Sequence, residues 1–248
     1  MFTSILKKRD SSVLTQLPTF TILRMNMNLT SWLRRLSTIT FSVILGLTIF
    51  SLPAHAFINT DYQKLLVTNA CNNCDLSGAD LSNRDLYGSA LNGANLSKAN
   101  LSGALLNDAK LQGANLTEAN LSEGILMGTT LTEAILTGAN LANADLYNAL
   151  INKAKLNNAN LTNADLTSAI ISDADLSNAV AKNAQLRGAV LSRSNLSSAD
   201  FSSSFMRNSR LSDATLQGAK FFNADLSNSL MPNSTTYNGN VTQFGAYQ

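Results

Sequence analysis

The sequence predicts an all-β fold in which the chain winds as a solenoid with square coils. From Leu76 to Met231 every fifth residue is apolar without a break in phase, and 25 of these 32 residues are Leu. Two places before each stands a small residue, with the exceptions Cys74, Arg84, Gly124 and Thr129. A period of five fits neither a helix nor the two-residue alternation of a strand. Both sets of residues point to one axis only if the chain turns a corner every five residues, as in a solenoid.

The residues that replace Leu indicate coils of 20 residues, with four five-residue units each. Ile151 and Ile171 are 20 apart, as are Ala181, Phe201 and Phe221. Residues 20 apart would lie in adjacent coils, so the large Phe201 is expected beside the small Ala181, where their volumes offset. The 32 units then make about eight coils.

The unit A-[DN]-L-x-x, as in GANLSKANLSGALL and NADLTSAIISDADLSNA, closely resembles the pentapeptide-repeat family over residues 74–231. This resemblance implies a right-handed quadrilateral β-helix. The preceding segment NTDYQKLLVTNACNNCDLSGADL is similar to secreted cyanobacterial or thylakoid-lumen members, in which a short helix and a Cys-x-x-Cys precede the first coil. Residues 57–73 are therefore expected to hold an N-terminal capping helix and the Cys-x-x-Cys.

Both ends of such a stack are open strand edges that need covering. The capping helix is predicted over residues 57–70, where Tyr62, Leu65 and Leu66 have the spacing of one apolar stripe on a helix. The tail 232–248 is expected to cover the last coil through Tyr237, Phe244 and Tyr247. Arg84 occupies an inward position that suits a small residue, and in the first coil we expect it to point outward.

Residues 1–56 are typical of a targeting segment rather than of a folded domain. Arg34 and Arg35 precede the uncharged apolar stretch 36–50, and a small-x-small motif ends at Ala56. These are the parts of a secretory signal peptide, with cleavage after Ala56. The apolar stretch is shorter than the roughly 20 residues that span a membrane; the alternative is a retained signal that anchors the protein.

The start codon is open among Met1, Met25 and Met27. The later starts give a signal peptide of ordinary length, over about residues 27–56. A start at Met1 adds a Ser-, Thr- and Lys-containing stretch such as an organelle transit peptide carries, and the adjacent arginines are also compatible with a twin-arginine signal. We expect export, to the periplasm or the thylakoid lumen.

The net charge changes when residues 1–56 are removed. They hold six of the 18 basic and one of the 16 acidic residues, so the remainder has 12 basic and 15 acidic residues and a net charge of −3. The formal charge of +2 of the whole sequence gives no nucleic-acid footprint. The charge of −3 and the export signal argue against a DNA-mimicking topoisomerase inhibitor, a role known in the family and kept as an alternative. An ice-binding solenoid, a further alternative, would need full Thr rows, and only Thr117 and Thr137 stack.

Cys71 and Cys74 form the only cysteine constellation. An exported protein permits a structural disulfide between them; reduced core cysteines and a redox-active pair are the alternatives. A zinc site needs about four ligands, and after residue 56 the chain has no His and no third Cys. We expect neither a metal nor a cofactor.

The sequence offers no catalytic arrangement. The single histidine, His55, lies in the targeting segment. Aspartates recur with the repeat just before the inward residue, where solvated or turn-bonded carboxylates are expected. Catalytic loops commonly interrupt a scaffold, and no insertion interrupts this repeat. The sequence therefore predicts a protein that is not an enzyme.

Outward apolar residues are the remaining candidates for function. Leu150, Ile170 and Val190 replace the usual Asn or Asp at intervals of 20 and should stack on one face. A second group consists of Leu105, Ile125, Met127 and Tyr147. Such a stripe forms either a partner surface or incidental packing along the ladder. The predicted function is an exported structural or protein-interaction scaffold, whose partner is an unidentified protein or a second copy, with membrane contact only through an uncleaved signal.

Overall fold

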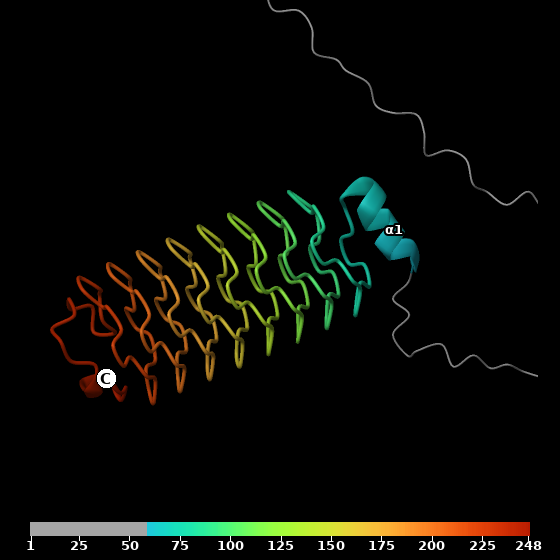
Figure 1. The fold of residues 1–248 in the computed structure, drawn as a ribbon. Coiled ribbons are helices and arrows are strands. Elements are labelled where there is room, and N and C mark those ends of the chain that lie inside the picture. The colour runs from blue at the N-terminus through green and yellow to red at the C-terminus, as the bar shows by residue number, and fades with distance from the viewer. Residues whose placement is uncertain (1–58) are drawn as a thin grey trace, which may run out of the picture. The chain divides into compact units, whose positions relative to one another are not determined.

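In the computed structural model, which describes residues 59–248, a stack of coils follows a single α-helix (Figure 1). The helix α1 spans Asn59–Thr68, and a short 3-10 helix, η1, spans Thr242–Phe244 in the tail. Within the described residues neither helix has the length and apolar character needed to cross a membrane. The predicted signal peptide, its cleavage site and the three candidate start methionines lie outside the described residues.

Parallel β-bridges join each coil to the next, and the two residues of each bridge between repeat coils are 20 apart. Four columns of bridges run along the stack, beginning with the pairs Ala70–Ala90, Asp75–Asn95, Asp80–Asn100 and Asp85–Leu105. The predicted coil of 20 residues with four sides is therefore confirmed.

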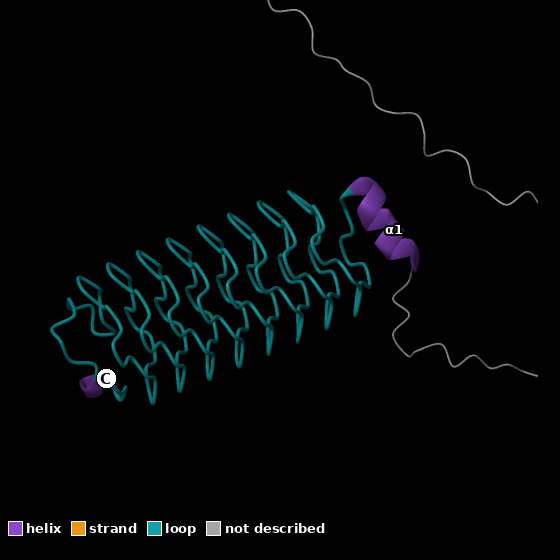
Figure 2. Cartoon of the chain, in the orientation of Figure 1, coloured by secondary structure: helices purple, strands orange, loops and turns teal. Residues whose placement is uncertain are grey.

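Strands in the usual sense are absent from residues 59–248, which differs from the all-β prediction (Figure 2). The reason is the length of each side. Leu76 O accepts a hydrogen bond from Ala79 N at 3.1 Å, and Gly78 between them has a φ of 66°. A positive φ at the third residue is the requirement of a type II turn. Each five-residue unit contains such a turn, so one bridging residue is left per side and the pairing cannot extend into a strand.

The inward positions form one continuous core. All 32 repeat positions from Leu76 to Met231 are buried. Burying one such side chain stabilises the fold by about 1.5–3 kcal/mol. Phe201 and Phe221 stack in adjacent coils with ring centroids 5.5 Å apart and planes 7° apart. The bridge Val180–Asp200 places Ala181 and Phe201 in adjacent coils, as predicted.

At the N-terminal end, α1 covers the first coil, as expected, but it ends two residues earlier than predicted. It ends at Thr68 because Asn69 adopts a left-handed φ of 52°, with its N–H donating to Leu65 O at 2.8 Å. Leu65 is buried and Tyr62 packs partly against the core. Leu66 is 40% exposed, so the prediction that it belongs to the packed stripe is wrong.

The first coil also begins earlier than predicted. Cys71 donates its backbone N–H to Ala90 O at 2.7 Å and is fully buried. It therefore holds the inward position five residues before Leu76, and the cysteine pair belongs to the coil rather than to a separate cap. Arg84 points outward, as expected, and its guanidinium donates to the Tyr62 hydroxyl at 3.2 Å. This bond ties α1 to the first coil.

The tail covers the last coil by continuing its hydrogen bonding. Phe221 N donates to Tyr247 O at 2.8 Å, and Tyr247 N donates to Ala219 O at 2.7 Å. Val241 is fully buried, and Tyr237 and Phe244 pack against the core. Tyr247 contributes its backbone only, because 56% of the residue remains exposed.

Candidate interaction surface

The residue just before each inward Leu points outward, and its side chain sets the chemical character of each solvent-exposed face of the solenoid. On one face it carries an asparagine ladder, defined here as Asp80, Asn100, Asn120, Asn140 and Asn160. Each Asn Nδ2 donates to the Oδ1 one coil earlier at 3.1–3.2 Å. Each Oδ1 also accepts the backbone N–H two residues later at 3.1–3.3 Å. The ladder thus pairs its polar groups within the chain.

An aspartate begins this ladder because the first member has no earlier side chain to which it could donate. A carboxylate only accepts hydrogen bonds, so it leaves no unpaired amide. Asp80 accepts from the Ser82 hydroxyl at 2.7 Å and from Asn100 at 3.2 Å. Hydrogen bonds from the Ser82 hydroxyl and amide hold the pKa of Asp80 below its ordinary value. Two shorter ladders likewise begin at Asp75 and Asp175.

Another face carries the apolar row, defined as Leu150, Ile170 and Val190. Bridges join Leu150 to Ile170 and Ile170 to Val190, so the predicted stacking of these three residues is confirmed. Leu150 is 37% exposed and Ile170 is 38% exposed, whereas Val190 is half-buried. The structure therefore leaves apolar surface open at positions where the ladder face has polar groups bonded to each other.

A charged corner borders the apolar row on the side toward the next face. It consists of Glu133, Lys153, Asp173, Arg193 and Asp213, which occupy the same turn position in successive coils and alternate in sign. Arg193 donates from Nε and Nη2 to the two Asp173 carboxylate oxygens at 2.7 Å each. These bonds hold the pKa of Asp173 below its ordinary value and raise the pKa of Arg193. Lys153 Nζ lies 3.9 Å from Glu133.

The corner on the other side of the row carries aromatic, sulfur and guanidinium groups. Met127 is 37% exposed and Tyr147 is 38% exposed, and both stand at the turn that leads into the row's face. Two coils beyond Tyr147, Arg187 lies over the ring of Phe205 at 6.0 Å, and in the next coil Arg207 pairs with Asp225 at 3.2 Å. Leu105, 39% exposed, adds apolar surface on the adjoining face. The predicted second group therefore continues the exposed apolar surface around this corner.

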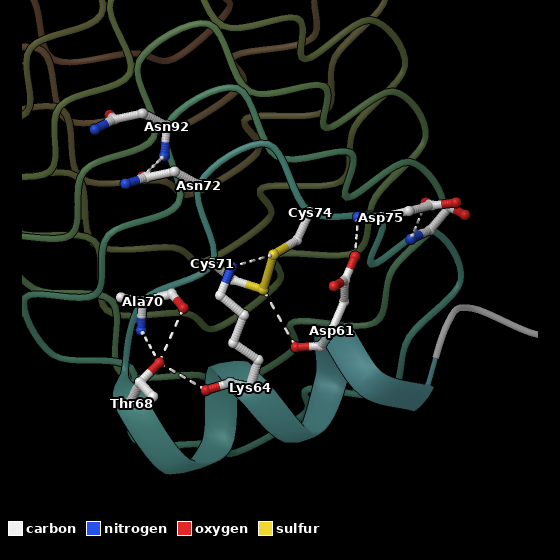
Figure 3. Close-up of a disulfide and its surroundings, with 10 residues drawn as sticks. Asp61, Lys64, Thr68, Ala70, Cys71, Asn72, Cys74, Asp75 and Asn92 are labelled. Carbon is white, nitrogen blue, oxygen red and sulfur yellow. Dashed lines mark hydrogen bonds between the residues drawn. A yellow bond between two sulfur atoms is a disulfide. The ribbon is translucent and has the colours of Figure 1, made fainter.

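The cysteine pair lies against α1, and the structure joins Cys71 and Cys74 in a disulfide (Figure 3). The Lys64 ammonium is 3.8 Å from Cys74 Sγ, and the Asp61 carbonyl oxygen is 3.2 Å from Cys71 Sγ. The Asp61 carboxylate accepts the backbone N–H of Asp75 at 2.9 Å. A carboxylate oxygen of Asp61 and the two sulfurs lie within 4.8 Å of one another, but disulfide sulfurs are not the thiolates that bind metals.

The disulfide thus fastens the turn of the first coil on which α1 rests. Cys71 is fully buried and Cys74 is 5% exposed, so both sulfurs are shielded from an attacking thiol. Shielding of this kind suits a structural bond better than a redox-active one.

A family model described as pentapeptide repeats matches the chain in eight copies, over residues 74–113, 85–122, 114–152, 125–163, 144–180, 169–208 and 191–228. The chain belongs to the pentapeptide-repeat family. The fold of this family is a right-handed β-helix solenoid, and the bridged coils of this chain form such a solenoid.

Several solved pentapeptide-repeat structures are similar to this chain. HetL, involved in regulating heterocyst differentiation in the cyanobacterium Nostoc sp. strain PCC 7120, is 31% identical over 68% of this chain and 89% of HetL, with a TM-score of 0.32. QnrB1, a plasmid-mediated fluoroquinolone resistance protein, is 21% identical over 72% of this chain and 82% of its own, with a TM-score of 0.33.

A pentapeptide-repeat protein from the Arabidopsis thaliana thylakoid lumen is 24% identical over 47% of this chain and 70% of its own, with a TM-score of 0.15. No curated protein matches the chain.

Proposed function

We propose that this pentapeptide-repeat protein is an exported, non-enzymatic scaffold that binds a protein partner through the apolar row. The observation that carries the proposal is a run of three apolar residues in adjacent coils of one face, of which Leu150 and Ile170 are 37% and 38% exposed. Contiguous exposed apolar surface bordered by polar groups is a feature of protein-interaction sites. The rigid repeat presents the row at a fixed spacing, and no inserted loop covers it.

Export rests on the sequence of residues 1–56, and we propose the periplasm or the thylakoid lumen as the destination. A disulfide is compatible with either compartment. N-terminal sequencing of the native protein should begin at Phe57. A native protein that still contains Trp32 would contradict cleavage and favour a signal anchor.

We also propose that the repeat forms eight quadrilateral coils. With a spacing of about 4.8 Å between bridged segments, their length is roughly 38 Å. The alternative is a DNA-mimicking topoisomerase inhibitor, a role known in the family. The alternating signs along the charged corner favour a protein surface over the continuous negative surface that a mimic of DNA requires.

Association measured with matched variants tests the proposed role of the apolar row. The processed wild-type protein is compared with Ile170→Asn and with Val180→Asn, a residue of similar exposure on the ladder face. The cross-linked complexes in the native compartment should disappear with Ile170→Asn and persist with Val180→Asn. Loss of the same complexes in both variants, or in neither, would contradict a site at the row.

A further inference from the structure

We propose that the apolar row and the charged corner bind a second copy of this chain, packed face to face and antiparallel. The inference rests on the proposed function of the row and names its partner. The row itself provides apolar surface but no direction or register. The charged corner beside it provides both, because its signs alternate in steps of one coil.

Symmetry makes this alternation self-complementary. Two copies packed face to face about a two-fold axis perpendicular to the solenoid run antiparallel, and the interface uses the same patch on both. The charged corners then lie on the same side of the interface, with their residues in reverse order. An axis that passes between two coils brings opposite charges together, whereas an axis through a coil brings like charges together.

The charges select a register in which the axis passes between the coils of Asp173 and Arg193. Asp173 then faces Arg193 of the second copy, and Lys153 faces Asp213 of the second copy. Lys153 and Asp213 suit such a contact because their intrachain pairing is weak. Lys153 reaches Glu133 only at 3.9 Å, and Asp213 is exposed and forms no ion pair within 4.0 Å among the described residues.

The residues nearest the axis agree with this register. Ile170 meets Val190 of the second copy, so the centre of the interface is apolar. Leu150 lies opposite Arg210 of the second copy, whose aliphatic stem can cover it. Tyr147 meets Arg207 of the second copy, a pair suited to a cation–π contact. A register one coil nearer the N-terminus also pairs opposite charges, but it would bring the exposed Lys110 and Arg210 together, and like charges disfavour it.

The dimer should be weak and sensitive to salt. One face of a narrow solenoid is a small interface, in the class of transient contacts below about 1,200 Å². Exposed ion pairs add little each and are screened by salt. We therefore expect a dissociation constant of about 10–1,000 µM at low salt.

The test is a charge-swap cycle between residues that cannot touch within one chain. Lys153 and Asp213 are three coils apart, about 14 Å along the stack. The full chain is expressed with its own N-terminus, and the processed product is sedimented at concentrations up to about 1 mM. Lys153→Glu and Asp213→Lys should each weaken dimerisation about tenfold, because each change places like charges in two symmetric contacts. The double variant should return to within about threefold of the wild type.

Controls separate this contact from general effects of charge. Exchange of Lys98 and Glu118, a pair 3.6 Å apart on a different corner, should leave dimerisation unchanged. Ile170→Asn should abolish the dimer with an unchanged circular dichroism spectrum. A wild-type protein that stays monomeric, or a double variant no better than the single ones, would overturn the proposal. If the wild type is monomeric but Ile170→Asn still loses a cross-linked complex, the partner is another protein and the proposed function stands.

Discussion

The asparagine ladder and the apolar row occupy the same structural position on two faces of one solenoid. Both sets of residues stand just before an inward residue, and both are joined by parallel bridges to the coils on either side. The ladder bonds its side chains to one another and to the following turns. The row has no such bonds to make and leaves 37–38% of Leu150 and Ile170 exposed. The scaffold therefore tolerates either chemistry at this position, and under the proposed function the apolar choice serves association.

This comparison predicts that a ladder residue contributes to folding and that a row residue contributes to association. Asn120→Leu should give the largest effect on folding, since Asn120 bonds to Asn100, to Asn140 and to Ser122. Its loss leaves these groups with fewer partners and should lower the free energy of unfolding by about 1–3 kcal/mol. Thermal unfolding should shift downward by roughly 2–12 °C. Thr130→Leu, which extends the apolar row, is the control and should stay within about 0.5 kcal/mol.

A row residue should show the opposite behaviour. Ile170→Asn should change the free energy of unfolding by less than about 0.5 kcal/mol, because Asn occupies the equivalent position in many coils. Association through the row should weaken about tenfold or more, since a few apolar anchors supply most binding energy in an interface. Circular dichroism melting and sedimentation of the same samples separate the two quantities. A large loss of melting temperature would show instead that Ile170 packs as part of the scaffold.

The repeat made the interior predictable from sequence to single residues. The five-residue phase placed all 32 inward residues from Leu76 to Met231, and the 20-residue spacing of unusual residues placed Phe201 beside Ala181. The stacking of the apolar row followed from the same spacing. A regular repeat permits this because each unit repeats the geometry of the last, so position in the sequence determines position in space.

The ends of the stack were harder to predict because each of their contacts is formed once. Leu66 has the spacing of the packed stripe, yet the coil presents no surface to cover it. Cys71 could have been recognised as an inward residue from its distance of five to Leu76. The asparagine ladder could also have been predicted from the sequence, because an Asp is followed by Asn residues at intervals of 20. Side-chain amides pair across coils only when adjacent coils both carry them, so the column has to be read as a whole.

The ladder breaks at Val180, and restoring it should stabilise the protein. Val180 is 36% exposed and follows Asn160 in the column. Val180→Asn would provide an Nδ2 for Asn160 Oδ1 and an Oδ1 for the backbone N–H of residue 182. We expect the free energy of unfolding to rise by about 0.5–1 kcal/mol, as measured by urea denaturation. The same substitution at Ile170 has no adjacent amide to bond, so it should give no gain; an equal gain at both sites would contradict a cooperative ladder.

The smallest expected effect is a change in the free energy of unfolding at acidic pH, and it tests why an aspartate begins the ladder. In the folded protein the pKa of Asp80 lies below its ordinary value because Ser82 donates to the carboxylate from its hydroxyl and its amide. The stabilisation from such a group is fully present above the unfolded pKa, near 3.9, and is lost as the pH falls through the lower folded pKa.

Asp80→Asn keeps an oxygen that accepts these bonds and does not titrate, and its new amide would face solvent because Asp80 is exposed. The variant should therefore be somewhat less stable than the wild type in urea at neutral pH, where the ionised carboxylate accepts these bonds more strongly than a neutral amide does, and it should lose less stability below about pH 4. Asp80→Ala, which removes the acceptor, should be less stable at neutral pH. If Asp80→Asn were instead as damaging as Asp80→Ala at neutral pH, the charge rather than the acceptor would be what the first coil requires, and the ladder would begin with Asp for an electrostatic reason.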